Sequence, residues 1–201
     1  MSYIIAGLGN PGEEYVNTRH NTGRIVLDYL YKKLSTKNGF SDWKEDKKLK
    51  ALTSEAVFKK DKIILLMPNN FMNNSGQSLK PLITNKKKAS ELIVVYDDLD
   101  LPLGSFKISF NKGSGGHRGL ESIIKNIKTK EFIRIRVGIS PVASSGKLKK
   151  PKGEKEVVDF IIKDFKPAEI ETLKKVSKKI TESVESIFND GLQKAMSLQN
   201  N

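Results

Sequence analysis

The sequence predicts an α/β fold, in which a twisted, mixed and largely parallel β-sheet is flanked by α-helices. Two observations support this prediction. Segments rich in Ile, Val, Leu and Phe alternate along the chain with segments of helical periodicity, and this alternation favours a sheet covered by helices on both faces. The 201 residues, of which 37% are apolar, suffice for one ordinary core. We therefore expect residues 1–201 to form a single domain.

The predicted elements follow from local composition. Helical periodicity is clearest over 22–35, after an expected N-cap at Asn21 or Thr22. Strand-like segments are 2–8, 51–59, 62–67, 91–96, 105–110 and 133–139. Further helices are expected at 75–84, 118–127, 167–188 and 189–198. Residues 143–156 combine lysines, glycines and proline without periodicity, which predicts a mobile lysine-rich loop before C-terminal helices within 157–201.

The charge of the chain points to a polyanionic partner. There are 36 Lys and Arg residues against 23 Asp and Glu, a formal net charge of +13. Because Lys and Arg neutralise phosphates, this excess favours nucleic acid. The alternative is a lysine-rich surface that only keeps the protein in solution. Only five of the basic residues are arginines, and four of these lie in or beside the motifs described below.

Composition also excludes several kinds of site. The absence of cysteine rules out disulfides, a thiol nucleophile and a thiolate metal site. No apolar run approaches the roughly 20 residues that span a bilayer. The N-terminal residues have neither a signal-peptide nor a transit-peptide pattern, so we expect a cytoplasmic protein.

The segment Gly7-Leu8-Gly9-Asn10-Pro11-Gly12 has the G-x-G-x-x-G form of a dinucleotide-binding loop. Such a loop needs free backbone N–H groups and a helix that opens at the third glycine. Pro11 removes one N–H, and the residues after Gly12 are polar and aperiodic. The segment is therefore predicted to present side chains, among them Asn10, and to lead to His20.

His20 is a candidate general base, because a neutral imidazole titrates near ~6.5 and it lies in a polar loop. A base needs an orienting group. Asp97, Asp98 and Asp100 follow an apolar run and are expected at the carboxyl end of a strand, where open α/β sheets place their sites. One of these carboxylates could fix the tautomer of His20. The alternative is a Mg²⁺ site built from the three carboxylates.

Two further clusters are polar. In Asn69–Gly76, we interpret Asn73 as a residue that orients a carbonyl or a developing oxyanion, and Asn74 and Ser75 as helix-cap residues. The glycine-rich segment Lys112–Leu120, which contains His117, runs into a predicted helix and could bind an anion. No G-x-S-x-G nucleophile elbow exists in the chain. Direct attack by a water molecule that His20 activates is the remaining mechanism.

Together these segments resemble bacterial-type peptidyl-tRNA hydrolase. The matching pieces are GLGNPGEEYVNTRHNTG (7–23), FMNNSG (71–76), VVYDDLDLPLG (94–104), GSGGHRGLESI (113–123), FIRIRVGI (132–139) and GLQKAM (191–196). The resemblance implies a monomeric hydrolase that cleaves the ester between peptide and tRNA and so recycles tRNA from stalled translation. It also implies that no metal and no cofactor is needed.

The resemblance further implies roles for individual residues. His20 would be the base that activates water, and Asp97 would orient His20. Asn10 and Asn73 would position the ester and stabilise its oxyanion. The implied substrate-binding residues are Tyr15, Phe71, Met72, His117 and Arg118. The implied tRNA-binding residues are Arg136, Lys107 and Lys112.

This chain departs from the family pattern at two positions. Arg118 stands where the family usually has an asparagine that orients water and the substrate carbonyl; arginine can donate a hydrogen bond but cannot accept one. Ser109 stands where the family has a phosphate-clamping lysine, and Lys107 or Lys112 could replace it. A non-catalytic RNA-binding protein on the same fold, as in related chloroplast splicing cofactors, is the alternative function. A third interpretation, a nucleotide-dependent enzyme, is supported by Gly7, Gly9 and Gly12 alone.

Overall fold

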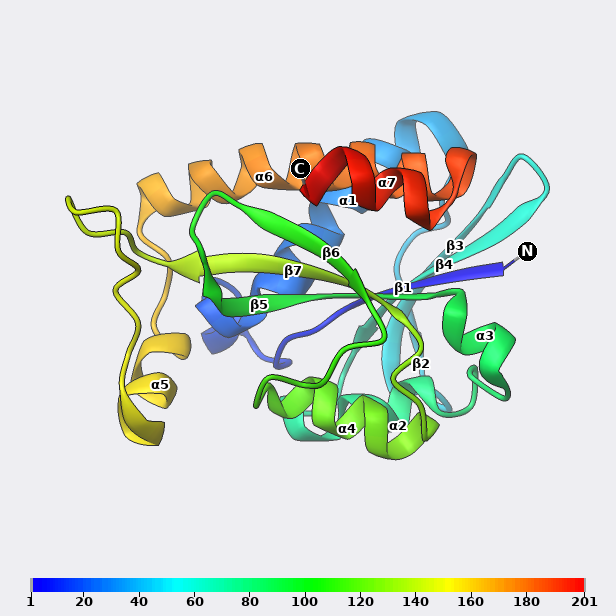
Figure 1. Cartoon of the computed structure of the whole chain (residues 1–201). Coiled ribbons are helices and arrows are strands. Elements are labelled where there is room, and N and C mark those ends of the chain that lie inside the picture. Colours follow the sequence, from blue (N-terminus) through cyan, green and yellow to red (C-terminus); the bar gives the residue numbers. More distant parts are fainter. Residues whose placement is uncertain (1, 201) are drawn as a thin grey trace.

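The computed structural model describes residues 2–200 and contains one seven-stranded sheet in the order β2-β3-β4-β1-β5-β7-β6 (Figure 1). The four central strands are parallel, and the strands toward both edges are antiparallel. The strands are β1 (Ser2–Gly7), β2 (Lys44–Asp46), β3 (Ala51–Phe58), β4 (Asp61–Pro68), β5 (Leu92–Pro102), β6 (Phe106–Phe110) and β7 (Ile133–Ser140). The predicted mixed, largely parallel sheet is confirmed.

Helices cover both faces of this sheet, as Figure 1 shows. The α-helices are α1 (Thr22–Asn38), α2 (Ser75–Leu79), α3 (Lys86–Ser90), α4 (Arg118–Ile127), α5 (Gly153–Ile161), α6 (Pro167–Asp190) and α7 (Leu192–Asn200). Helices α1, α6 and α7 pack on one face, whereas α2 and α4 pack on the other. Two buried apolar clusters fill the two layers between helices and sheet. Helix α5 lies apart, beyond the ends of β5 and β7.

Close backbone contact sets the start of α1 against the sheet. A Cβ added to Gly7 would lie 2.4 Å from the carbonyl oxygen of Gly23, and one added to Gly23 would lie 2.3 Å from that of Val95. Only glycine allows this approach. As a consequence the 3-10 helix Arg19–Asn21, directly before α1, lies beside β5. The glycines thus bring His20 to the sheet.

The structure corrects several predicted boundaries. Strand β5 does not end at residue 96 but continues to Pro102, because Asp97 and Asp98 still pair with β7. The three acidic residues therefore lie within a strand, and not after its end. Helix α2 ends at Leu79 instead of 84, since a turn begins at Lys80 and Pro81 follows it. Helix α1 extends three residues beyond the prediction, to Asn38, before Gly39 adopts a left-handed conformation.

The sequence patterns did not predict the 3-10 helices, the strand β2 or the helices α3 and α5. The strand β2 and the helix α3 are only three and five residues long and carry no apolar periodicity. Helix α5 begins at Gly153, inside the predicted loop 143–156, and has Glu154 and Glu156 in its first turn, where the helix dipole favours acidic side chains. The C-terminal helices were predicted at nearly their observed positions, with α6 two residues longer and α7 starting at Leu192.

Candidate active site

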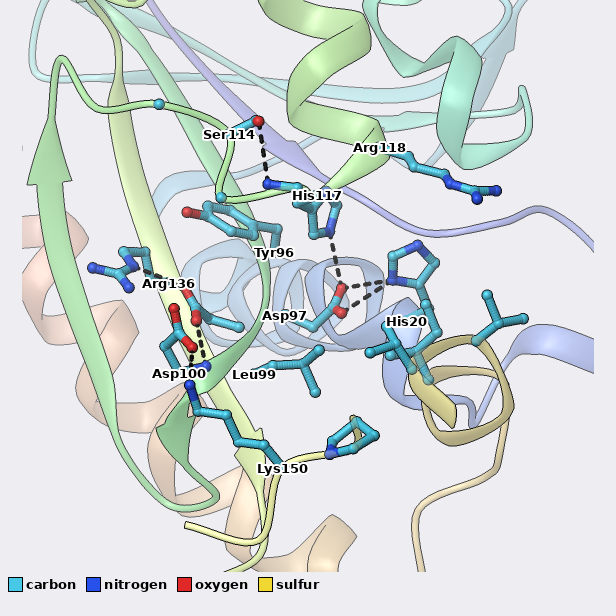
Figure 2. A pocket seen from close by; sticks show the side chains of 18 of the residues that line it. His20, Tyr96, Asp97, Leu99, Asp100, Ser114, His117, Arg118, Arg136 and Lys150 are labelled. Atoms are coloured by element: carbon cyan, nitrogen blue, oxygen red, sulfur yellow. Dashed lines mark hydrogen bonds and ion pairs between the residues drawn. The ribbon is translucent and has the colours of Figure 1, made fainter. Parts of the chain in front are cut away.

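The centre of the candidate site is the buried carboxylate of Asp97, which lies between two histidines (Figure 2). Its oxygens are 3.0 and 3.1 Å from Nδ1 of His20, and Oδ1 is 3.2 Å from Nε2 of His117. His20 comes from the 3-10 helix before α1, Asp97 from β5, and His117 from the position just before α4. The two imidazole centroids are 5.0 Å apart. Three separate elements thus converge on one carboxylate.

Hydrogen-bond chemistry assigns the protons of both histidines. The backbone N–H of Leu120 donates to Nδ1 of His117 at 3.3 Å, so Nδ1 is unprotonated and Nε2–H donates to Asp97. An ionised carboxylate only accepts, so Nδ1 of His20 also carries a proton. Nε2 of His20 is then the free, basic nitrogen, on the side of the ring away from Asp97 in Figure 2. This is the tautomer that a general base requires.

Electrostatics stabilise this arrangement. Burial by itself would raise the pKa of Asp97, but the charges and hydrogen bonds of His20 and His117 outweigh it and hold the pKa well below its usual range. Burial lowers the pKa of His20, but the charge and hydrogen bond of Asp97 raise it more, so the net pKa lies above the ordinary 6.5. The nearby cation Arg118 opposes this increase. His20 is therefore a stronger base than a free imidazole.

The two histidines and Asp97 line a cavity of about 850 Å³. The glycine-rich segment 112–118 forms one wall, and helix α5 contributes the apolar side chains Val157, Val158 and Ile161. Two exposed ion pairs lie at the cavity. Arg118 pairs with Glu154 of α5 at 2.6 Å, and Lys150 pairs with Asp100 of β5. The basic nitrogen of His20, the apolar side chains of α5 and the cations Arg118 and Lys150 therefore border the same cavity.

Asn10 and the segment around Met72 form a second group of predicted residues. The side-chain oxygen of Asn10 accepts from the backbone N–H of Met72 at 2.8 Å. Asn21, predicted as a helix cap, makes no capping bond and instead bonds the backbone N–H and carbonyl of Asn10. The ring of Tyr15 meets that of Phe71 edge to face, with centroids 6.5 Å apart, and Phe71 is exposed. These contacts join the first loop to the Met72 turn.

Not all predicted residues surround the cavity. Asn73 is exposed on the 3-10 helix Met72–Asn74, and Asn10, Tyr15, Phe71 and Met72 are likewise absent from the lining of the cavity around His20. By contrast, Arg118, His117 and Lys112 do line it. The geometry therefore divides the predicted residues into a group around Asp97 and a group around Asn10.

Of the predicted tRNA-binding residues, Arg136 lies on β7, Lys107 lies on β6, and Lys112 lies in the loop that follows β6. Arg136 lines the cavity, and its Nε donates to Asp98 at 2.7 Å. Lys107 on β6 is the direct register partner of Arg136 on β7, so both side chains leave the same face of the sheet. Ser109 is buried. Ser109 itself is therefore not placed to contact phosphate, whereas the neighbouring Lys107 is exposed.

The acidic cluster of β5 is divided among different partners. Asp97 binds the two histidines, Asp98 binds Arg136, and Asp100 binds Lys150. This arrangement speaks against a Mg²⁺ site made of the three carboxylates, because each already faces a donor. Among the described residues, His20, Asp97 and His117 are the group whose side chains could hold a metal ion, because their ligand atoms lie within 4.8 Å of one another. Hydrogen bonds within the trio account for its geometry.

Comparison with known proteins decides the family. The family model for peptidyl-tRNA hydrolase matches residues 4–201. The chain belongs to the peptidyl-tRNA hydrolase family. A peptidyl-tRNA hydrolase of Thermoanaerobacter sp. (strain X514) is 41% identical over 196 residues, which cover 97% of each chain. That of Aquifex aeolicus is 41% identical over 177 residues, covering 88% of this chain and 84% of the relative.

Solved structures give the same result. A crystal structure of peptidyl-tRNA hydrolase from Acinetobacter baumannii superposes with a TM-score of 0.83 at 28% identity, covering 97% of this chain and 92% of the other. The predicted α/β fold and the resemblance to this family are confirmed. No helix in the described part of the chain has the length and apolar character that a membrane crossing requires.

Sequence reasoning missed several residues of this peptidyl-tRNA hydrolase family site. Tyr96 stacks edge to face on His117 with centroids 5.0 Å apart, and Glu154 holds Arg118. The apolar wall of α5 was also missed, although Val157, Val158 and Ile161 have helical spacing. That spacing was the available signal. The adjoining lysines and glycine concealed it.

Proposed function

We propose that this chain hydrolyses the ester bond between peptide and tRNA in peptidyl-tRNA, with His20 as the base that activates water. The observation that carries the proposal is the pair of hydrogen bonds from Nδ1 of His20 to Asp97, which leaves Nε2 basic beside a cavity. Family membership supports the substrate, because the relatives are peptidyl-tRNA hydrolases. The net charge of +13 suits a polyanionic substrate.

In the proposed reaction, a water molecule donates a hydrogen bond to Nε2 of His20. As the water oxygen bonds to the ester carbonyl carbon, its proton moves to Nε2, and the carbonyl oxygen becomes an oxyanion. Asp97 stabilises the imidazolium that forms. The tetrahedral intermediate then breaks its bond to the ribose oxygen, which takes the proton back from Nε2 and leaves as the tRNA hydroxyl. His20 ends in its starting state.

His117 acts on the same carboxylate in this proposal. Its Nε2–H donates to Asp97, and its Nδ1 caps α4 by accepting from Leu120. Together the two bonds hold the carboxylate in the orientation that accepts the hydrogen bond from Nδ1–H of His20. His117 thus contributes orientation, which matters because displacement of a reacting group by ~1 Å can cost ~10²-fold in rate.

The peptide ester is proposed to lie against Asn10, Asn73 and Met72. The side-chain oxygen of Asn10 is engaged by Met72, so its Nδ2 group is the end that donates to the substrate. An amide donor to the oxyanion contributes roughly 10²–10³-fold in rate. The exposed side chain of Asn73 and the rings of Tyr15 and Phe71 would contact the peptide beyond the ester.

The tRNA is proposed to bind the cations at the cavity and along β6 and β7. Arg136 and Lys107 lie side by side and would contact phosphate, with Lys112 nearby on the glycine-rich segment. Arg118 would exchange Glu154 for the substrate, either at the oxyanion or at the terminal phosphate. We further propose that the chain acts in the cytoplasm as a monomer and uses neither a metal nor a cofactor. Nothing favours the non-catalytic RNA-binding alternative, because the histidine–aspartate arrangement is intact.

Cleavage of an N-blocked aminoacyl-tRNA by the native chain and by His20→Ala tests the proposal. We expect turnover by the native chain and a loss of kcat of at least about 10²-fold in the variant, as for removal of a general base. Binding of the substrate to His20→Ala, measured by filter retention, serves as the control and should change little. Undiminished turnover by His20→Ala would sink the mechanism. Binding without turnover by the native chain would favour the RNA-binding alternative.

A further inference from the structure

Arg19, the residue before His20, is a buried cation that the proposed reaction does not use. It begins the 3-10 helix Arg19–Asn21 and is only 6% exposed. A buried charge is retained only where charges and hydrogen bonds compensate the loss of water. The partners of Arg19 therefore indicate what its position achieves.

The guanidinium binds a segment far away in sequence, at the junction of α5 and α6. Nη1 donates to the carbonyl oxygens of Lys163 and Asp164 at 3.1 and 2.9 Å. Nη2 donates to the carboxylate of Glu169 in α6 at 2.9 Å. One guanidinium thus joins the turn after α5 to the first turn of α6.

Aromatic rings enclose the same guanidinium. Its central carbon lies 4.6 Å from the ring centroid of Phe160 in α5 and 5.3 Å from that of Phe165 in the turn. Cation–π contacts of this kind strengthen when water is excluded. The arginine is therefore surrounded by the α5–α6 junction on several sides.

The backbone adds a second connection between these segments. The N–H of Arg19 donates to the carbonyl of Lys163 at 3.1 Å, and the N–H of Phe165 donates to the carbonyl of Asn17 at 2.9 Å. Thr18 and Asp164 form an isolated antiparallel bridge. Side chain and backbone together fix the turn that carries His20 to the segment that follows α5.

This connection spans two walls of the active-site cavity. His20 lines the cavity, and so do Val157, Val158 and Ile161 of α5, the helix that contacts the turn of His20. Ile161 directly follows Phe160, which stacks on Arg19. The distance between the base and the apolar wall therefore depends on the Arg19 contacts.

We propose that Arg19 is a positioning residue that fixes His20 relative to the α5 wall, so that a substrate bound in the cavity presents its ester to the basic nitrogen of His20. The proposal rests on the assignment of His20 as the base. It also explains why an arginine is needed. A lysine ammonium is a compact point charge without the planar fork, and cannot reach two carbonyls and a carboxylate while stacking on two rings.

The test is the variant Arg19→Lys, with Val184→Ala as a control for lost stability. Val184 is a buried residue of α6 that lies 15 positions, roughly 22 Å of helix, beyond Glu169. Both variants are assayed at a temperature where circular dichroism shows them folded. We expect kcat of Arg19→Lys to fall about 10-fold or more with KM within about 2-fold, because a displaced base slows the chemical step. Val184→Ala should keep the native kcat.

A spectroscopic measurement separates positioning from mere loss of stability. The hydrogen-bonded Nδ1–H proton of His20 has its own NMR resonance, which should shift or broaden in folded Arg19→Lys and remain unchanged in Val184→Ala. An unchanged resonance together with a native kcat in folded Arg19→Lys would overturn the proposal. This outcome is distinguishable from failure of the proposed function, in which His20→Ala itself would retain activity.

Glu169→Gln provides a second variant should Arg19→Lys fail to fold. Glutamine still accepts from Arg19 and from the N–H of Lys166, which the carboxylate of Glu169 binds at 2.7 Å to cap α6. Only the negative charge of residue 169 is lost, so we expect a folded protein with kcat lowered roughly 3-fold, as the ion pair becomes a bond between the cation and a neutral amide. A native kcat in both folded variants, or in Glu169→Gln where Arg19→Lys is unfolded, counts against the inference.

Discussion

The floor and the mouth of the cavity both pair basic with acidic side chains, but they do so in opposite surroundings. On the floor, the side chains of His20, Asp97 and His117 are 11%, 4% and 9% exposed. At the mouth, Arg118 and Glu154 are 62% and 80% exposed, and Lys150 and Asp100 are 44% and 63% exposed. Exposed pairs contribute only about 0–1 kcal/mol, whereas removing one partner of a buried pair costs about 3–5 kcal/mol. The floor is suited to fixed geometry and the mouth to exchange of partners.

The largest expected effect comes from changing the floor without changing its shape. In Asp97→Asn an NH2 group replaces one of the two carboxylate oxygens, both of which face Nδ1 of His20, so a second donor meets the Nδ1–H group. We expect kcat to fall on the order of 10³- to 10⁴-fold, because His20 is no longer held in the basic tautomer. Single-turnover cleavage of an N-blocked aminoacyl-tRNA measures it. The matched control Asp100→Asn, at the mouth, should stay within about 2-fold; equal losses would remove the distinction between floor and mouth.

The floor also sets the pH dependence. The pKa of His20 is raised above 6.5, and only its unprotonated form is a base, so kcat/KM should rise with pH through a midpoint above 6.5. Well below this midpoint, activity should fall by about tenfold per pH unit. The residual activity of Asp97→Asn should have its pH midpoint at a lower pH than the native chain, because burial lowers the pKa of His20 and the carboxylate that raised it is gone. A flat profile of the native chain would contradict a histidine base.

A moderate effect is expected at the sheet edge, where Lys107 faces Arg136 across β6 and β7. If Lys107 binds phosphate, Lys107→Ala should raise KM roughly 5-fold and reduce the slope of log KM against log salt by about 1. The control is Lys44→Ala on β2, an exposed lysine at the opposite edge of the sheet. An equal change in both variants would mean that Lys107 contributes only through the overall positive charge of the protein.

The smallest effects are expected at the mouth. Glu154→Gln weakens the hold on Arg118 and should lower KM about 2-fold, whereas Arg118→Asn, which restores the residue usual in the family, should change kcat by no more than about 3-fold. Thermal unfolding should shift little in either variant. A loss in Arg118→Asn as large as that in Asp97→Asn would place Arg118 among the reacting groups.

The sequence identified most of the fold because strand and helix signals are local. The long apolar segments and the helix 118–127 were found at or near their observed bounds. Where prediction failed, partners elsewhere in the chain decided. Lys44–Asp46 has no apolar pattern and is a strand because β3 pairs with it, and β5 continues through Asp97 because β7 does. Local periodicity carries no record of such pairing.

The sequence by itself determined the residue types of the site: a histidine in a polar loop, a carboxylate after an apolar run, and glycines that allow close backbone approach. Only the tertiary structure decided which of these meet. It placed His117 on Asp97, Arg118 against Glu154 36 residues away, and Arg19 against Glu169 150 residues away. It also left Asn73 outside the cavity around His20. The physical reason is that spacing along a chain fixes only neighbours within an element, whereas contacts between elements depend on how sheet and helices pack.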